Sequence, residues 1–167
     1  RVATVTMDRP AVHNAFNAEL IAELTAALAR AGADPEVRAV VLAAEGASFS
    51  AGADLGWKRA MAGFGEAENL ADALKLAELM RTLAYLPKPT IARVQGSAFG
   101  GGVGLIACCD IALAAEDARF GLTESKLGLV PAVISPYVVA AIGARHARRW
   151  FQTGALFDAG KALAIGL

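Results

Sequence analysis

Residues 95–104 read QGSAFGGGVG, and this glycine-rich stretch decides the fold class because of what stands on either side of it. The preceding segment, residues 90–94 (TIARV), is typical of a strand, and the glycines run into an apolar segment that predicts a helix ending at Cys109. Residues 110–114 (DIALA) then predict a second strand, buried in a sheet. A strand, a helix and another strand in succession indicate an α/β domain.

The same alternation extends toward the N-terminus. Residues 2–7 alternate with period two as a strand does, and residues 39–44 (AVVLAA) predict a short strand buried on both faces. Between them, Asn17 is the predicted N-cap of an amphipathic helix. The small and polar residues 45–54 predict a loop, and the spaced leucines of residues 70–83 predict a long helix.

Composition narrows the classes of function. The chain is 56% hydrophobic, and its mean hydropathy is +0.46, which excludes a disordered protein. Its 16 basic and 16 acidic residues give a formal net charge of zero, so we expect neither nucleic acid nor an anionic membrane as a partner. Because no repeat or linker interrupts the sequence, residues 1–167 are predicted to form a single domain.

The cysteines, the histidines and one uncharged stretch exclude further classes. Cys108 and Cys109 are adjacent and poorly placed to form a disulfide, which favours a reducing, cytoplasmic location. His13 and His146 lie far apart and lack the spacing of metal ligands, so no metal site is expected. Residues 127–144 have about the minimum length of a membrane span, but prolines and glycines interrupt a continuous helix there.

Three features could carry chemistry. The small residues 50–54 precede a helix, so their backbone N–H groups can face a ligand, although Asp54 could simply cap that helix. The glycines of residues 100–104 open another helix and suit a developing oxyanion, or else only permit tight packing. Glu124 has mostly apolar neighbours, which would raise its pKa and suit it to proton transfer, unless it is exposed and paired with Lys126.

Two other patterns are weaker. Gly102-x-Gly104-x-x-Ala107 matches a dinucleotide fingerprint, but residues 95–101 separate it from the preceding strand, so a nicotinamide-dependent oxidoreductase is disfavoured. Ser97 does not stand in the Gly-x-Ser-x-Gly pattern of hydrolases and has no nearby histidine to activate it.

The order of the motifs resembles the enoyl-CoA hydratase/isomerase (crotonase) family. The matching motifs are, in chain order, Asp8-Arg9-Pro10 with Asn14-Ala15, Ser50 to Leu55, Gln95 to Gly104, and Phe120 to Pro131. The resemblance covers essentially the whole chain and implies a crotonase spiral of repeated ββα units that assembles as a homotrimer or hexamer. Family members usually continue into C-terminal helices, which residues 1–167 are expected to lack or not to show. Residues 86–92 and 129–139 are most similar to bacterial methylglutaconyl-CoA hydratases.

The resemblance also implies a set of site residues. A CoA thioester would place its carbonyl oxygen in an oxyanion hole made by the backbone N–H groups of Ala53 and Gly101, with Glu124 as the catalytic acid. The residues that we assign to substrate binding on this resemblance are Asn14, Ala15, Ala51, Asp54, Leu55, Phe99, Gly104, Thr123 and Pro131. Coenzyme A is part of the substrate, so no separate cofactor is expected.

One position departs from the family pattern. Well-known hydratases of the family carry two glutamates, of which Glu124 matches the second, whereas the first falls at Gly104. With one acid the two-acid mechanism is incomplete, and single-acid members include isomerases. We hypothesise that Gly104 leaves room for the methyl branch and carboxylate of a methylglutaconyl chain. The predicted function is therefore hydration of a branched 2-enoyl-CoA, with a Δ3,Δ2-enoyl-CoA isomerase and a non-catalytic acyl-CoA binder as the alternatives.

Overall fold

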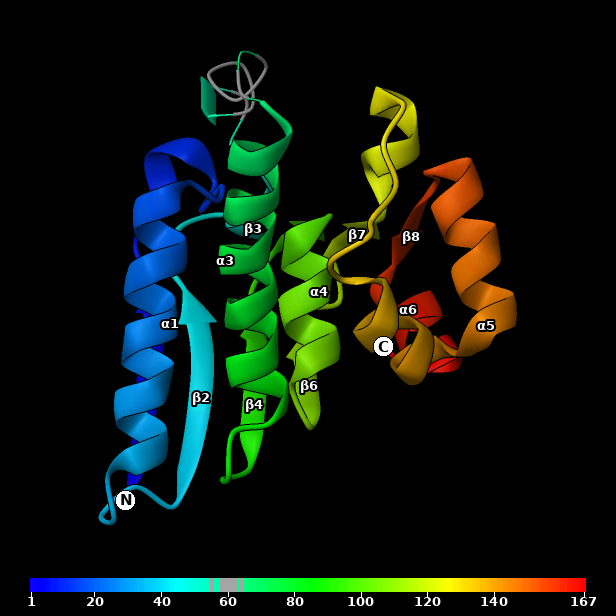
Figure 1. Ribbon diagram of the computed structural model, residues 1–167. Coiled ribbons are helices and arrows are strands. Elements are labelled where there is room, and N and C mark those ends of the chain that lie inside the picture. The colour runs from blue at the N-terminus through cyan, green and yellow to red at the C-terminus, as the bar shows by residue number, and fades with distance from the viewer. Residues whose placement is uncertain (55, 58–62, 64) are drawn as a thin grey trace.

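Two four-stranded sheets form the framework of the computed structural model, which describes residues 1–54, 56–57, 63 and 65–167 (Figure 1). The first sheet is parallel and has the strand order β1-β2-β4-β6, with β1 Val2–Met7, β2 Ala39–Ala44, β4 Thr90–Val94 and β6 Ile111–Ala114. The second sheet has the order β3-β5-β7-β8, with β3 Ser48–Ser50, β5 Ser97–Phe99, β7 Arg119–Gly121 and β8 Leu156–Asp158. Only β8 runs antiparallel to its neighbour among these described strands.

Helices cover the first sheet and continue past its edge. The helical elements are η1 Pro10–Val12, α1 Ala18–Ala33, α3 Glu66–Ala84, α4 Gly101–Cys108, η2 Thr123–Leu127, α5 Ser135–Thr153 and α6 Ala159–Ile165. In Figure 1, α1, α3 and α4 lie side by side across one face of the sheet. The stripe on α1 that the spacing predicts is buried there, and the Asn17 side chain accepts a hydrogen bond from the N–H of Leu20 (2.9 Å), which confirms the predicted N-cap.

The chain repeats one unit three times. A strand of the first sheet leads into a three-residue strand of the second sheet and then into a helix, as β2-β3-α3, β4-β5-α4 and β6-β7-α5. This order confirms the predicted spiral of ββα units. Because β3, β5 and β7 are parallel neighbours, the segments that leave their carboxyl ends meet at one edge of the second sheet.

Two expectations about the strands are corrected by the structure. Residues 110–114 are not a buried strand: β6 is the outer strand of the first sheet within the described residues, and Ile111 and Leu113 are 49% and 61% exposed. Residues 45–54 are not a loop throughout, because they contain β3, and the glycine-rich residues 95–104 likewise contain a short strand, β5. A three-residue strand is too short to display the alternation by which a strand is recognised in a sequence.

The uncharged stretch at residues 127–144 does not form a continuous helix. Helix α5 starts at Ser135 with Pro136 in its first turn, and Gly143 breaks its geometry with φ 75° and ψ 154°. In the part of the chain that the structure describes, no helix combines the length and the apolar character needed to cross a membrane.

Candidate active site

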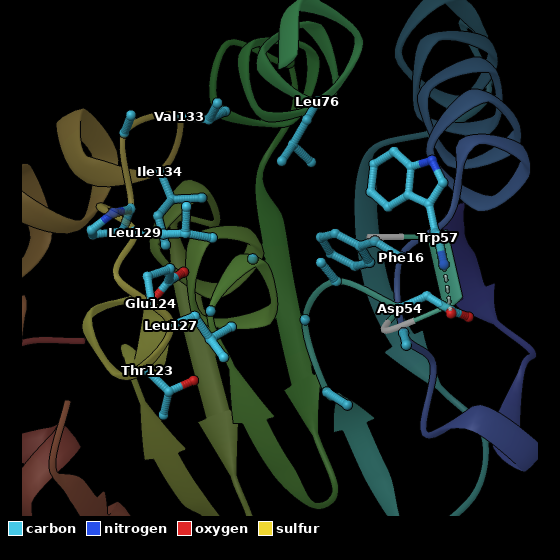
Figure 2. Close-up of a pocket in the computed structure, with 18 of the residues that line it drawn as sticks. Phe16, Asp54, Trp57, Leu76, Thr123, Glu124, Leu127, Leu129, Val133 and Ile134 are labelled. Atoms are coloured by element: carbon cyan, nitrogen blue, oxygen red, sulfur yellow. Dashed lines mark hydrogen bonds between the residues drawn. The ribbon is translucent and has the colours of Figure 1, made fainter. Parts of the chain in front are cut away.

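A cavity of about 610 Å³ opens where the segments after β3, β5 and β7 meet. Figure 2 shows Phe16, Asp54 and Trp57 on one side of it and Glu124, Leu127 and Leu129 on the other. We call residues 12–16 and 51–54 the first wall, and residues 123–134 the second wall. Leu76 of α3 also lines the cavity, and most of the lining is apolar. A cavity of this size, with few polar groups, is typical of a small-molecule site.

A β-bridge in the first wall fixes the direction of the Ala53 N–H. Phe16 and Ala53 form a parallel β-bridge, in which the N–H of Phe16 donates to Gly52 O (2.6 Å) and the N–H of Asp54 donates to Phe16 O (2.9 Å). Such a bridge uses the peptide groups on either side of Ala53, so the N–H of Ala53 itself points away from Phe16. Ala53 lines the cavity, and no acceptor in the described chain takes this N–H. The group is therefore available to a ligand.

A second N–H comes from the first turn of α4. Gly101 is the first residue of this helix, and the N–H groups of a first helical turn have no partner inside the helix. Gly100 and Gly101 both line the cavity. Gly100 turns the chain with φ 52° and ψ −118°, a backbone conformation that side chains disfavour. At Gly101 a Cβ atom would lie 2.5 Å from Cε2 of Phe16, so only glycine fits beneath that ring.

Hydrogen bonds of Asn14 and Arg9 hold the first wall in place. The buried side chain of Asn14 accepts from the N–H of Arg9 (2.8 Å) and donates to the carbonyls of Glu45 (2.8 Å) and Ser48 (2.9 Å). The Arg9 guanidinium donates to Ala15 O (2.5 Å) and lies 3.6 Å from a carboxylate oxygen of Asp54. Asn14 therefore fixes the backbone behind the cavity and does not line it.

Asp54 also caps the segment that follows it. Its Oδ1 accepts from the N–H groups of Gly56 (2.8 Å) and Trp57 (3.2 Å), as the carboxylate of an N-cap does. The capping role anticipated for Asp54 is thus confirmed, and Asp54 lines the cavity as well.

The second wall carries the carboxylate of Glu124. This residue lies in η2, is half-buried and lines the cavity, so it is not the exposed surface glutamate of the alternative interpretation. The carboxylate lies directly against the turn at Gly100, because a Cβ atom at Gly100 would be 2.9 Å from Oε1 of Glu124. The acid therefore stands next to the turn that presents the N–H of Gly101.

Similarity to known proteins agrees with this geometry. The sequence model of the enoyl-CoA hydratase/isomerase family matches residues 1–167. The chain belongs to the enoyl-CoA hydratase/isomerase family. A Thermus thermophilus protein named as a candidate enoyl-CoA hydratase is 42% identical over 166 residues, which are 99% of this chain and 66% of that protein.

Solved structures of the family superpose closely on the chain. The crystal structure of a candidate enoyl-CoA hydratase/isomerase (crotonase) from Legionella pneumophila is 53% identical, with a TM-score of 0.97, and the match covers 99% of this chain and 64% of that one. An enoyl-CoA hydratase from Shewanella pealeana is 51% identical with the same TM-score of 0.97, and the match covers 99% of this chain and 62% of that one. The chain thus spans slightly less than two thirds of the length of these relatives.

The position of the missing family glutamate is filled by another side chain. A Cβ atom at Gly104 would lie 2.3 Å from Cγ2 and 2.8 Å from Cβ of Ile134, and 3.3 Å from Cε of Met80. Gly104 is buried and does not line the cavity, whereas Ile134 does. The hypothesis that Gly104 leaves room for substrate is therefore corrected: Ile134 occupies the space in front of it.

The residues that the sequence assigned to the site fall into two groups, those that line the cavity and those that do not. The assigned residues that line it are Ala15, Ala51, Ala53, Asp54, Gly101, Thr123, Glu124 and Pro131. Asn14, Phe99 and Gly104 lie behind the lining, and Leu55 is outside the described residues. The cavity residues that the sequence did not single out include Phe16, Trp57, Leu76, Leu127, Leu129, Val133 and Ile134. Apart from Leu76 of α3, they share an apolar side chain in or near a family motif, which does not distinguish a lining residue from a core residue.

Other chemistries find no support at this site. Burial raises the pKa of both Cys108 and Cys109 to about 12, so these thiols stay protonated near neutral pH. Ser97 Oγ accepts a hydrogen bond from the N–H of Arg119 (3.2 Å) and does not line the cavity. Among the described residues, no three His, Cys, Asp or Glu side chains are grouped to hold a metal ion.

Proposed function

We propose that the protein is a hydratase that adds water to a branched, methylglutaconyl-like 2-enoyl-CoA thioester. The observation that carries this proposal is the placement of the Glu124 carboxylate against Gly100, immediately before Gly101 and across the cavity from Asp54, the neighbour of Ala53. A thioester carbonyl held between the two N–H groups would bring its C2 and C3 atoms toward the second wall. Family membership supports the CoA thioester as the class of substrate.

In this mechanism the N–H groups of Ala53 and Gly101 donate to the thioester oxygen and stabilise the negative charge of the enolate. Glu124 takes a proton from water while the water oxygen bonds to C3, and the carboxyl group then donates a proton to C2. One O–H bond of water and the π bond between C2 and C3 break, one C–O bond and one C–H bond form, and Glu124 returns to its starting state. The reaction consumes no redox equivalent, and coenzyme A enters as part of the substrate.

The branched acyl group is the finer part of the proposal. It is supported by the resemblance of residues 86–92 and 129–139 to methylglutaconyl-CoA hydratases and by the apolar side chains of the second wall. Leu127, Leu129 and Ile134 offer surface for a methyl branch. For the carboxylate of the acyl group, the first wall offers the imidazole of His13, which lines the cavity and whose Nδ1 lies 3.1 Å from Ser48 Oγ.

The proposal extends to the assembly and its location. We infer a homotrimer or hexamer in the cytoplasm from the family resemblance, and the unpaired thiols of Cys108 and Cys109 agree with a reducing compartment. Sedimentation of the full-length protein tests the assembly, and a monomer would contradict it.

The test uses the full-length protein with three substrates. Crotonyl-CoA is unbranched, 3-methylcrotonyl-CoA adds only the methyl group, and 3-methylglutaconyl-CoA adds the methyl group and a carboxylate. We expect the absorbance of the conjugated thioester to fall fastest with 3-methylglutaconyl-CoA, and the product to gain the mass of water. Equal rates with the two methylated substrates would remove the carboxylate from the proposal, and no loss of absorbance with any of the three would contradict hydration.

The contact between Gly104 and Ile134 favours isomerisation as the second candidate. It puts an apolar side chain where a second acid would otherwise help to hold water, and a single carboxylate is enough to shuttle one proton between carbons. A 3-enoyl-CoA substrate would then gain conjugated absorbance without any change of mass. A non-catalytic binder would instead hold acyl-CoA without exchanging its α-proton in deuterated water.

A further inference from the structure

Ser50 lies between the two segments that present the Ala53 and Gly101 N–H groups. It is the last residue of β3, its exposed fraction is 0%, and it does not line the cavity. Its hydroxyl donates to Asn14 O (2.9 Å) and accepts from the N–H of Gly52 (3.2 Å). One hydroxyl therefore joins the anchored Asn14 to the residue that immediately precedes Ala53.

The same side chain abuts the first turn of α4. A Cβ atom at Gly102 would lie 2.9 Å from both Cβ and the carbonyl oxygen of Ser50, and 3.3 Å from its Oγ. The backbone of Gly102, which follows Gly101, thus rests directly on Ser50. Ser50 touches the neighbour of each of the two N–H groups, and it does so while fully buried and outside the cavity lining.

The segment around Gly52 has little room to move independently. Gly52 has φ 81°, and a Cβ atom there would lie 2.8 Å from the carbonyl oxygen of Phe99 at the end of β5. Gly52, the residue before Ala53, is therefore held between the end of β5 and the Ser50 hydroxyl.

We propose that Ser50 is a positioning residue that sets the separation and direction of the N–H groups of Ala53 and Gly101. This inference rests on the proposed function, in which these two groups bind the thioester oxygen. Donors of this kind act only when they lie about 2.7–3.1 Å from the oxygen that becomes charged, and a misplacement of about 1 Å can cost a hundredfold in rate. A residue in contact with both segments controls that geometry without touching the substrate.

The experiment measures how strongly the bound thioester carbonyl is polarised. The probe is the CoA thioester of 4-dimethylaminocinnamic acid, whose absorbance shifts to the red when hydrogen bonds draw charge onto its carbonyl oxygen. The full-length protein is compared with Ser50→Ala, which removes the hydroxyl, and with Ser50→Cys, which keeps a side chain of similar size and a weak hydrogen bond. Ser97→Ala is the matched control, because it removes a hydroxyl that also accepts from a backbone N–H in the second sheet, away from the cavity.

We expect Ser50→Ala to lose most of the red shift and about tenfold in kcat with little change in KM, less than the 10²–10³-fold cost of deleting a donor. Ser50→Cys should lie between Ser50→Ala and the unaltered protein, and it carries the test if Ser50→Ala does not fold. Ser97→Ala should keep the full shift.

Two results would overturn the inference. A normal shift and normal kcat in folded Ser50→Ala and Ser50→Cys would leave the hydroxyl a purely structural role and the proposed function intact. An unaltered protein that binds the probe without any shift would overturn both the proposed oxyanion hole and the role of Ser50.

Discussion

The two walls of the cavity are built by different means. In the first wall the backbone is fixed by hydrogen bonds: Asn14 ties residues 9–14 to residues 45–48, and the Phe16–Ala53 bridge fixes the direction of the Ala53 N–H. The second wall begins with the 3-10 turn η2 and contains Leu127, Leu129 and Val130, which are 56%, 51% and 77% exposed. The shape of the second wall comes from side chains, whereas the role that we propose for the first wall comes from peptide groups.

This difference means that the residues that select the substrate can change independently of the backbone that holds the Ala53 N–H. A peptide N–H cannot be altered by substituting its own side chain, so the first wall keeps the Ala53 N–H as long as its buried network is intact. The second wall supplies the acid and the apolar surface, and each of its side chains can change without moving the donors. We therefore expect substitutions in the first wall to act mainly on stability and those in the second wall mainly on rate and substrate choice.

The largest effect is expected at the acid of the second wall. Glu124→Gln should lower kcat/KM for hydration by about 10²–10⁴-fold, because the amide cannot take or give the proton, while the unfolding midpoint stays close to that of the unaltered protein. The rate is followed by the absorbance of the conjugated thioester. Glu116→Gln, at an exposed glutamate away from the cavity, is the control and should be fully active. Full activity in Glu124→Gln would show that Glu124 is not the catalytic acid.

The next effect concerns the network of the first wall. Asn14→Ala should lower the free energy of unfolding by about 2–4 kcal/mol, because it leaves the N–H of Arg9 and the carbonyls of Glu45 and Ser48 without their partner. Urea denaturation gives the value. Asn17→Ala, which removes a single capping bond, should cost only about 1 kcal/mol. If the two variants were equally stable, the hydrogen bonds of Asn14 would contribute no more than one helix cap, and the first wall would not depend on them.

A smaller effect is expected at the contact between Gly104 and Ile134. Gly104→Ala should destabilise by about 1–3 kcal/mol, since the added methyl would overlap the Ile134 side chain. In a double-mutant cycle, Ile134→Ala should absorb most of that cost. Gly104→Glu should not improve turnover of 3-methylglutaconyl-CoA, because its carboxylate would have to displace Ile134. Additive effects in the cycle would show that the two positions do not compete for space.

The smallest effect on stability is expected at the exposed end of the second wall. Val130→Ser should change the free energy of unfolding by less than about 0.5 kcal/mol, because the residue is 77% exposed. Its KM for a branched acyl-CoA should nevertheless rise, since Val130 lines the cavity. Steady-state kinetics with crotonyl-CoA and 3-methylcrotonyl-CoA measure the change. A large loss of stability with an unchanged KM would contradict the expectation that side chains of the second wall act on substrate choice and little on stability.

The sequence predicts the parts of this architecture that are local. Strands β1, β2 and β4 and the Asn17 cap follow from periodicity and from one side-chain hydrogen bond, so they can be recognised within a few residues. The short strands β3 and β5 could not be predicted, since their pairing is determined by the neighbouring strand. The exposure of β6 was missed for a similar reason, because the burial of a strand depends on how many neighbours it has.

The candidate site was predicted through the order of its motifs, and its packing was not. The motifs identified Ala53, Gly101 and Glu124, and all three line one cavity, while their roles there stay predictions. The contact of Gly104 with Ile134 joins positions on two different segments, and neither residue alone indicates it. The same holds for Ser50 and Gly102, whose proximity appears only when β3 and α4 are placed in space.

The pairing of the first sheet also has a consequence for the kinetics of folding. Its strands are parallel, and they pair across long stretches of chain: Met7 with Ala44, and Val40 with Thr90. No hairpin can therefore nucleate this sheet, and the loop entropy of each crossover has to be overcome before its pairing is gained. During synthesis β1 and β2 would emerge well before β4, and the central pairing of the sheet would wait for it. We expect slow folding, with a rate that depends more on the crossover helices α1 and α3 than on the strands themselves.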